Sequence, residues 1–256
     1  MVTVKDILHF VESIAPKELA MEWDHVGLLC GQSDKEVKTV LVALDPFTGV
    51  CQEAAKMGAD LLVTHHPVIF QPLTEVTDKT TVGRAVMTLI QNGIAAINAH
   101  TNLDCADGGV NDTLAETLQL ANIQKVGGDA DGLLRQGAVA AQDLDAFLDR
   151  VEQTLGCNGL RYVSGGKKVQ KVAVGGGACG SELHRVIAAG CDTFVTADVK
   201  YNQFCEAKEL GLNLIDAGHF ATENPVVAVL AKKIADQFPG ITVKISETHT
   251  DCVKYY

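Results

Sequence analysis

The stretch Leu61–Pro67, which reads LLVTHHP, places the strongest constraint on the fold of this chain. Its short apolar run, bounded by a proline, is typical of a buried β-strand. Pro67 lacks the N–H group that a central strand donates, so the strand should end at His65 and His66. Open α/β sheets usually bind ligands at the carboxyl ends of their strands, which makes this pair a candidate for metal binding. A pair of loop histidines without a ligand is the alternative.

The two histidines also constrain the local backbone. Adjacent residues of an extended strand point to opposite faces of the sheet. His65 and His66 can therefore share one centre only if the chain turns there, or if they serve two metals.

The composition argues against nucleic acid and membranes as partners. The chain has 256 residues, enough for one large domain or two small ones with a sizeable core. Its net charge of −11 repels nucleic acid over most of the surface. No apolar run approaches the length that spans a bilayer, and the N-terminus lacks the pattern of a signal peptide. The eight cysteines form no Cys-x-x-Cys pair, so we expect reduced thiols in a cytoplasmic protein.

The order of predicted elements indicates a layered α/β fold. Helical spacing covers residues 3–15, 50–57, 82–91 and 110–120, and strands are predicted over 37–44, 61–64 and 94–98. Residues 22–31 are predicted to form a turn, and residues 71–80 and 100–104 to form loops. The resulting order β-α-β-α-β-α favours a largely parallel sheet with helices on its faces.

The second half of the chain resembles the first. KTVLV at 38–42 matches QKVAV at 170–174, and GADLLVT at 58–64 matches GCDTFVT at 190–196, both 132 residues apart. His100-x-x-x-Asp104 similarly resembles His219-x-x-x-Glu223. Chance is an alternative for any single match, but a shared offset in the same element order favours a duplicated α/β unit. We therefore predict two pseudo-repeated lobes, residues 1–124 and 125–256.

A glycine-rich run, GGGACGS at residues 175–181, follows a predicted strand and precedes a helix. Backbone N–H groups in such a turn can cradle a phosphate. The run matches neither a Walker loop nor a dinucleotide fingerprint. A tight strand-to-helix turn without a ligand stays open as the alternative.

Five residues at or just past the ends of predicted strands form a candidate metal site. They combine three imidazoles with two carboxylates: His65, His66, Asp104, His219 and Glu223. This mixture suits zinc, iron or manganese and leaves coordination positions for water. The set is large enough for two divalent metals if a carboxylate bridges them, and two metals activate water near neutral pH.

The remaining histidines and their neighbours have less defined roles. His219 and Glu223 fit one helix face, whereas residues 100–104 are predicted to form a loop. His100 is then interpreted as a partner that orients a ligand, with a buried, hydrogen-bonded histidine as the alternative. Asp198 and Lys200 join His100 as candidate general acids. Three further histidines are interpreted as ordinary surface or core residues: His9, His184 and His249.

Six motifs, in order over nearly the whole chain, resemble the Nif-three-like dinuclear-metal family. These are the YbgI-like proteins that carry the name GTP cyclohydrolase I type 2 homologue. The motifs are EWDHVGL at 22–28, THHP at 64–67, AHTNLD at 99–104, GGVND at 108–112, TADVKY at 196–201 and DAGHFATE at 216–223. The family's metal ligands carry over onto the same five residues. The chain departs from the family pattern at His25, where Asn is usual, and at Asn202, where His is frequent.

The resemblance implies two intertwined α/β lobes with mixed, largely parallel sheets, a metal site in the cleft between them, and a homohexameric ring. It allows residues near 216–256 to pack back on the first lobe. We expect a metal-dependent hydrolase of a small heterocycle or phosphate, and opening of the purine ring of GTP is one compatible reaction. The alternative is a non-catalytic metal-holding or scaffold ring that binds protein partners.

Overall fold

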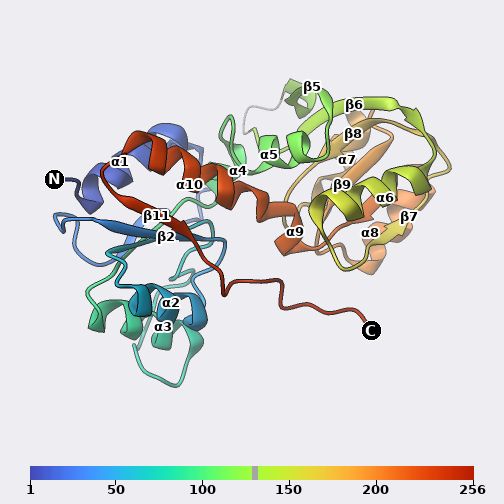
Figure 1. The fold of residues 1–256 in the computed structure, drawn as a ribbon. Helices are drawn as coiled ribbons and strands as arrows, with labels where there is room; N and C mark the ends of the chain where they lie inside the picture. Colours follow the sequence, from blue (N-terminus) through green and yellow to red (C-terminus); the bar gives the residue numbers. More distant parts are fainter. Residues whose placement is uncertain (129–131) are drawn as a thin grey trace. The chain divides into compact units, whose positions relative to one another are not determined.

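A computed structural model describes residues 1–128 and 132–256, which form two compact units (Figure 1). The first unit contains Met1–Ala106 and Val227–Thr250, and the second contains Asp107–Val226 and Asp251–Tyr256. Residues 107–124, which the sequence pattern assigns to the first lobe, thus belong to the second unit. Residues 227–250 return to the first unit. None of the helices within the described ranges is long and apolar enough to cross a membrane.

The first unit is built on a five-stranded sheet in the order β1-β4-β3-β2-β11. Its strands are β1 (Gly27–Cys30), β2 (Thr39–Ala43), β3 (Leu61–Thr64), β4 (Ala95–Asn98) and β11 (Thr242–Ile245). All neighbours are parallel except β1, which runs antiparallel to β4. Every residue of β3 is buried, as expected for a strand in the centre of a covered sheet.

Helices cover both faces of this sheet. They are α1 (Val4–Ile14), α2 (Thr48–Met57), α3 (Thr81–Gln91), the short α4 (Thr101–Cys105) and α10 (Pro225–Gln237), with a 3-10 turn at Lys17–Leu19. Helices α2 and α3 lie on one face, and α1 and α10 lie on the other (Figure 1). The rings of Phe10 in α1 and Phe238 after α10 pack edge to face, with centroids 5.7 Å apart.

The second unit contains a six-stranded sheet in the order β5-β6-β8-β9-β10-β7. Its strands are β5 (Ala121–Lys125), β6 (Arg135–Gln142), β7 (Arg161–Val163), β8 (Val169–Val174), β9 (Thr193–Thr196) and β10 (Asn213–Asp216). The central strands β8, β9 and β10 are parallel, and the outer pairings are antiparallel. The mixed, largely parallel α/β architecture predicted from the sequence is confirmed.

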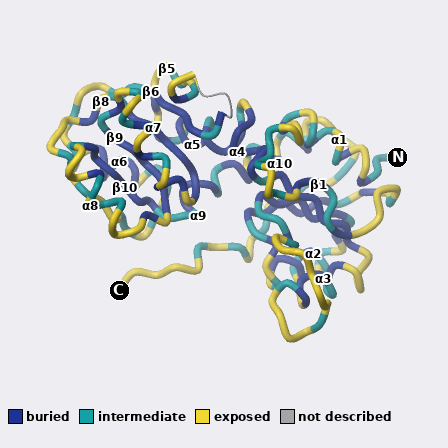
Figure 2. The backbone as a smooth tube through the Cα atoms, turned by 180° about the vertical axis from the view of Figure 1, so that it is seen from behind, coloured by how far each residue is buried: buried dark blue, intermediate teal, exposed yellow. Residues whose placement is uncertain are grey.

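Side chains of the second sheet alternate between two hydrophobic cores. The helices are α5 (Val110–Thr117), α6 (Leu144–Leu155), α7 (Leu183–Ala188), α8 (Tyr201–Glu209) and α9 (His219–Glu223), with 3-10 turns at Val126–Gly128 and Gly180–Glu182. Val172 and Val174 pack with α5 and α6, whereas Ala173 between them packs with α7 and α8. Figure 2 shows the central strands of both units as mostly buried and the connecting loops as mostly exposed.

The repeat predicted from the sequence extends to the pairing of the strands. In the first sheet Val40 of β2 lies opposite Leu61 of β3. In the second sheet Val172 of β8 lies opposite Thr193 of β9, so both partners are shifted by the same 132 residues. The same register in both units supports a duplicated α/β unit.

An aspartate closes each copy of the repeat in the same way. Asp60, before β3, accepts hydrogen bonds from the backbone N–H groups of Lys38 and Thr39 at 2.9 and 3.1 Å. Asp192, before β9, accepts hydrogen bonds from the backbone N–H groups of Gln170 and Lys171 near the start of β8. Both aspartates therefore tie the start of one parallel strand to its neighbour.

Two local predictions were wrong. Residues 22–31 were expected to form only a turn, but Gly27–Cys30 forms strand β1, whose short run is stabilised by pairing with the distant β4. Residues 100–104 were expected to form a loop, but Thr101–Cys105 is a helix in which all five residues are buried. Both elements depend on tertiary partners, which a local pattern does not reveal.

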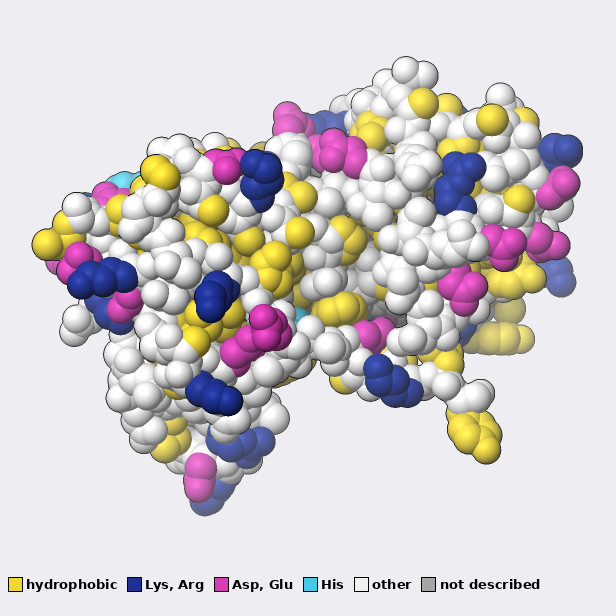
Figure 3. Space-filling view, viewed as in Figure 1, with side chains coloured by type: hydrophobic (Ala, Val, Ile, Leu, Met, Phe, Trp, Pro, Cys, Tyr) yellow, Lys and Arg dark blue, Asp and Glu magenta, His cyan; other side chains and the backbone are white. Residues whose placement is uncertain are grey.

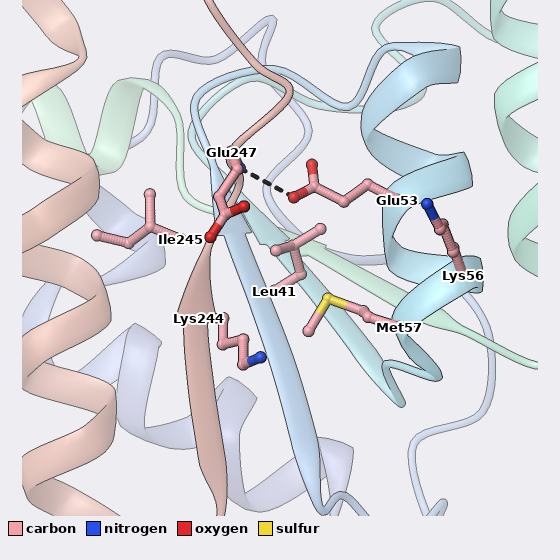
Figure 4. A pocket seen from close by; sticks show the side chains of 7 residues that line it. All are labelled: Leu41, Glu53, Lys56, Met57, Lys244, Ile245 and Glu247. Atoms are coloured by element: carbon pink, nitrogen blue, oxygen red, sulfur yellow. Dashed lines mark hydrogen bonds between the residues drawn. The ribbon is translucent and has the colours of Figure 1, made fainter.

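A hollow of about 260 Å³ lies between α2 and the edge strand β11 (Figure 4). Its lining mixes both signs of charge: Leu41, Glu53, Lys56, Met57, Lys244, Ile245 and Glu247. The Glu53 carboxylate accepts hydrogen bonds from the Glu247 N–H at 2.9 Å and from the Thr248 hydroxyl at 2.6 Å. These hydrogen bonds hold the chain segment that follows β11 against α2. Basic and acidic side chains are likewise interspersed on the face shown in Figure 3.

We predict that Asp60→Ala lowers the free energy of unfolding of the first unit by about 1–3 kcal/mol, because two backbone N–H groups lose their acceptor. Burial raises the pKa of Asp60, but hydrogen bonds from Lys38, Lys35 and Thr39 outweigh it and lower the pKa overall. This stabilisation should be present above the unfolded-state pKa near 4 and be lost as the pH falls through the folded-state pKa. Urea denaturation at neutral and acidic pH measures both effects. An equal loss in the exposed control Asp78→Ala would contradict the prediction.

Candidate metal-binding clusters

The chain turns immediately after β3, and both histidine rings lie together. The ring centroids of His65 and His66 are 4.8 Å apart. The turn is fixed by the Thr64 hydroxyl, which donates to the His66 carbonyl at 2.6 Å, and by the His66 N–H, which donates to the Leu44 carbonyl. The turn required for a shared centre is thus present in the structure.

An oxygen atom faces the Nδ1 atom of each of these histidines. His65, of which 1% is exposed, places Nδ1 2.9 Å from the Ala99 carbonyl oxygen. A carbonyl can only accept, so Nδ1 of His65 carries the hydrogen, and in the neutral ring the lone pair is on Nε2. His66 places Nδ1 2.7 Å from Asp45 Oδ1. Both rings are held as metal-binding histidines usually are, with the other nitrogen fixed by an acceptor.

His100 completes a cluster of three imidazoles in the first unit. Its ring centroid is 5.2 Å from that of His65 and 5.4 Å from that of His66. Each of the three offers a nitrogen within 4.8 Å of the others, a spacing that could hold a metal ion. His100 therefore lies among the candidate ligands themselves, and its role as an orienting partner stays a prediction.

Helix α4 brings Asp104 to the same cluster. Its side chain is buried, with Oδ1 3.6 Å from Nε2 of His65. A carboxylate oxygen and the lone-pair nitrogen of a neutral imidazole are both acceptors, so a cation between them would interact favourably with each. We call His65, His66, His100 and Asp104 the first cluster.

Asp24 is a site residue that the sequence reasoning did not single out. Its Oδ2 accepts hydrogen bonds from the N–H and the hydroxyl of Thr101 at 3.1 and 2.6 Å, and lies 3.0 Å from Nδ1 of His100. Burial raises the pKa of Asp24, but hydrogen bonds from His100 and Thr101 outweigh it and lower the pKa to about 2. The same ionised carboxylate therefore caps the N-terminus of helix α4 and orients His100.

Asp45 is a second residue that was missed, although it follows strand β2 next to β3. Its two oxygens lie 2.7 Å from His66 Nδ1 and 2.8 Å from His249 Nε2. Burial raises the pKa of Asp45, but the hydrogen bonds with both histidines hold it well below its usual range. His249, interpreted from the sequence as an ordinary residue, therefore helps to fix the carboxylate that orients His66. The sequence did offer one signal for Asp45, because it lies at the end of a predicted parallel strand, where ligand-binding residues are common.

His219 and Glu223 lie in helix α9, directly after β10 in the second unit. The predicted i,i+4 pairing is present, with His219 Nε2 3.0 Å from Glu223 Oε2. Glu223 is 4% exposed. His219 Nδ1 lies 2.8 Å from Oδ2 of Asp198, whose backbone adopts a left-handed φ of 51°. A metal ion bound to an imidazole between two carboxylates would interact favourably with both. We call His219 and Glu223 the second cluster.

The other residues singled out from the sequence are more peripheral. Lys200 is exposed at the start of α8, where its backbone N–H donates to the Gln203 side chain at 2.8 Å. Asp198 contacts His219 as an orienting carboxylate. His25 and Asn202, the departures from the family pattern, are both exposed. The general-acid roles of His100, Asp198 and Lys200 stay predictions.

The glycine-rich run supports the second cluster through its backbone. Gly176 N–H donates to the Asn111 side chain at 2.7 Å, and Gly177 N–H donates to the Thr222 hydroxyl at 3.1 Å. Cys179 N–H donates to the Thr196 hydroxyl. These donors already have protein acceptors, which favours the tight-turn interpretation over a phosphate cradle.

The predicted effect of Asp45→Asn is a loss of about 1–3 kcal/mol from the free energy of unfolding of the first unit. An amide presents an acceptor to only one of the two imidazoles and an N–H₂ group to the other, so one hydrogen bond to a charged acceptor is lost. Urea denaturation measures the change, with the exposed Asp78→Asn as the control. Identical stability of the two variants would show that Asp45 does not hold His66 and His249.

Gly177→Ala should disturb the second cluster. Gly177 has φ +64°, and a Cβ atom there would overlap Oε1 of Glu223. We expect a loss of about 1–3 kcal/mol in the second unit beyond the loss in Gly166→Ala, because overpacking adds to backbone strain. Gly166 is the matched control, since it has φ +77° but no atom of the described residues lies within 4 Å of the place its Cβ would take. Equal unfolding free energies for the two variants would count against this packing.

Comparison with known proteins identifies the family and agrees with the fold. Residues 2–252 match the family model described as Duf34/NIF3 (NGG1p interacting factor 3). A GTP cyclohydrolase 1 type 2 homolog of Streptomyces coelicolor is 38% identical, over 98% of this chain and 93% of that protein. A homolog of the same name from Clostridium perfringens is 32% identical, over 91% and 92%.

A solved structure gives the same result for the fold. The Bacillus cereus protein related to NIF3 superposes with a TM-score of 0.93 at 25% identity, covering 100% of both chains. The family model spans nearly the whole sequence, and the relatives align over nearly their whole length. The chain therefore belongs to the Duf34/NIF3 family.

Proposed function

We propose that this protein is a metal-dependent hydrolase in which His65, His66, Asp104, His219 and Glu223 hold two divalent metal ions. The observation that carries the proposal is the arrangement of the imidazoles. In each unit a histidine directs Nδ1 at an oxygen acceptor and Nε2 at a buried carboxylate. This orientation serves a metal ligand, because it fixes the ring and leaves Nε2 as the coordinating atom.

The donor set of both clusters fits a divalent cation. Imidazole nitrogens and carboxylate oxygens are ligands that zinc, iron and manganese share, so metal identity depends on supply and geometry. When bound, such ions act as Lewis acids and lower the pKa of water. The chain's own contribution is orientation: Ala99, Asp45, Asp24 and Asp198 fix the rings before any metal arrives.

The proposed substrate is a small heterocycle or phosphate. Support comes from the relatives, which carry the name GTP cyclohydrolase 1 type 2 homolog. Among the candidate general acids, His100 is best placed, since its ring packs against those of His65 and His66. Lys200 is exposed at a helix start, and the Asp198 carboxylate already faces His219. We therefore assign proton transfer to His100 and orientation to Asp198.

The test is elemental analysis of metal content together with turnover. We expect about two metal ions per chain in the wild type and a clear reduction in His65→Ala and Glu223→Ala, which remove one ligand from each cluster. His184→Ala is the matched control, because its exposed imidazole pairs with Glu206 and belongs to neither cluster. Wild-type protein without metal, even after addition of iron, zinc or manganese, would refute the proposal.

Hydrolysis is measured with GTP and other purine compounds on the same samples. We expect kcat/KM to fall at least about 100-fold in both ligand variants and after chelation, and to recover when metal is restored to the wild type. Two bound metals without turnover of any compound would reject the hydrolase and favour a metal-holding ring.

A further inference from the structure

Two large aromatic side chains are exposed beside the first cluster. Trp23, the single tryptophan of the chain, is 59% exposed, and Phe70 is 49% exposed. Their ring centroids are 5.8 Å apart with an interplanar angle of 62°. Exposed aromatic surface of this kind is costly in water and commonly marks a binding site.

Both rings also contact His100. The Trp23 and His100 ring centroids are 6.1 Å apart, and those of Phe70 and His100 are 6.2 Å apart, both edge to face. His100 in turn packs against His65 and His66. An aromatic surface is therefore continuous from solvent to the candidate metal ligands.

The backbone holds this surface in place. Trp23 immediately precedes Asp24, whose carboxylate is bound by Thr101 and lies 3.0 Å from the His100 ring nitrogen. Phe70 follows the turn that carries His66. Both rings thus come from segments that also position the imidazoles: Trp23 is next to the carboxylate that faces His100, and Phe70 lies shortly after the turn at His66.

We propose that Trp23 and Phe70 form a stacking platform for a planar, nucleobase-like heterocycle, whose edge then faces His100. This inference rests on the proposed function and specifies its substrate class. An aromatic face binds a planar ring of any base by stacking, and such contacts are worth about 10- to 100-fold in affinity. The imidazole of His100 supplies a hydrogen-bonding group at the edge of the stacked ring.

The surroundings favour a small planar ligand over a second copy of the chain. Glu22 and His25, on both sides of Trp23, are exposed polar residues. Aromatic surface with a few convergent polar groups is typical of a small-molecule site, whereas the cores of homodimer interfaces are more apolar. The exposed Leu73 and Val76 on the loop after Phe70 are the feature that a protein partner would use.

The fluorescence of Trp23 reports stacking directly, because the chain has no other tryptophan. Wild-type protein is titrated with guanosine, GTP and tripolyphosphate, with correction for light absorbed by the ligand. We expect saturable quenching by guanosine and GTP and none by tripolyphosphate. Calorimetry should show binding of guanosine at least about 10-fold weaker in Trp23→Leu and Phe70→Leu. Tyr162→Leu, an equally exposed aromatic on β7, is the control and should bind as the wild type does.

Other outcomes overturn the platform. They are absence of binding by guanosine, binding driven by tripolyphosphate alone, and equal affinity in all variants. If Trp23 emission changes with protein concentration but not with added ligand, and the Trp23→Leu variant has a smaller particle mass, the aromatic surface binds a second copy of the chain. Metal content is measured on every variant and the titration is repeated after chelation. If guanosine stacks on Trp23 in protein that holds no metal, the stacking platform stands and the proposed hydrolase function is refuted. If the protein holds two metals and turns over substrate but shows no stacking, the hydrolase function stands and the platform is refuted.

Discussion

A close oxygen atom at Nδ1 of each candidate histidine is the contact on which both clusters depend. The acceptors are a backbone carbonyl for His65 and carboxylates for the other three rings, those of Asp45, Asp24 and Asp198. A free imidazole rotates and exchanges tautomers, whereas a ring held at one nitrogen presents the other in a fixed direction. The acceptors are therefore as much a part of the candidate site as the rings that they hold.

The two sheets supply candidate ligands by the same construction. In the first unit, the third parallel strand β4 leads into the short helix α4, which carries Asp104. In the second unit, β10 leads into the equally short α9, which carries His219 and Glu223. Because parallel strands end at the same edge of a sheet, each unit gathers polar side chains at one edge while its strands remain buried. A duplicated α/β unit thus accounts for two clusters of similar chemistry in one chain.

The two copies of the α/β unit differ in how each one fixes the short helix that carries its candidate ligands. The first carries a carboxylate that caps a helix from 77 residues away in the sequence, since Asp24 binds the N-terminus of α4. In the second, the backbone N–H group of Gly177 donates to Thr222 of α9, and the glycine turn leaves no room for a side chain beside Glu223. Both solutions satisfy polar groups that would otherwise be buried without partners, which is a condition for keeping charged ligands inside a protein.

Local patterns in the sequence determined much of this protein. The buried run before His65, the repeated offset and the glycine stops predicted the central strands, most helices and the duplicated architecture, because periodicity and breakers act on neighbouring residues. The residue types at strand ends also pointed to five candidate ligands, whose joint role stays a prediction. The tertiary structure alone decided that Thr101–Cys105 is a helix and that Gly27–Cys30 is a strand. It also decided that the Asp45 carboxylate contacts both His66 and His249. Those features arise from hydrogen bonds between residues far apart in the chain, and no local pattern encodes the partner of such a bond.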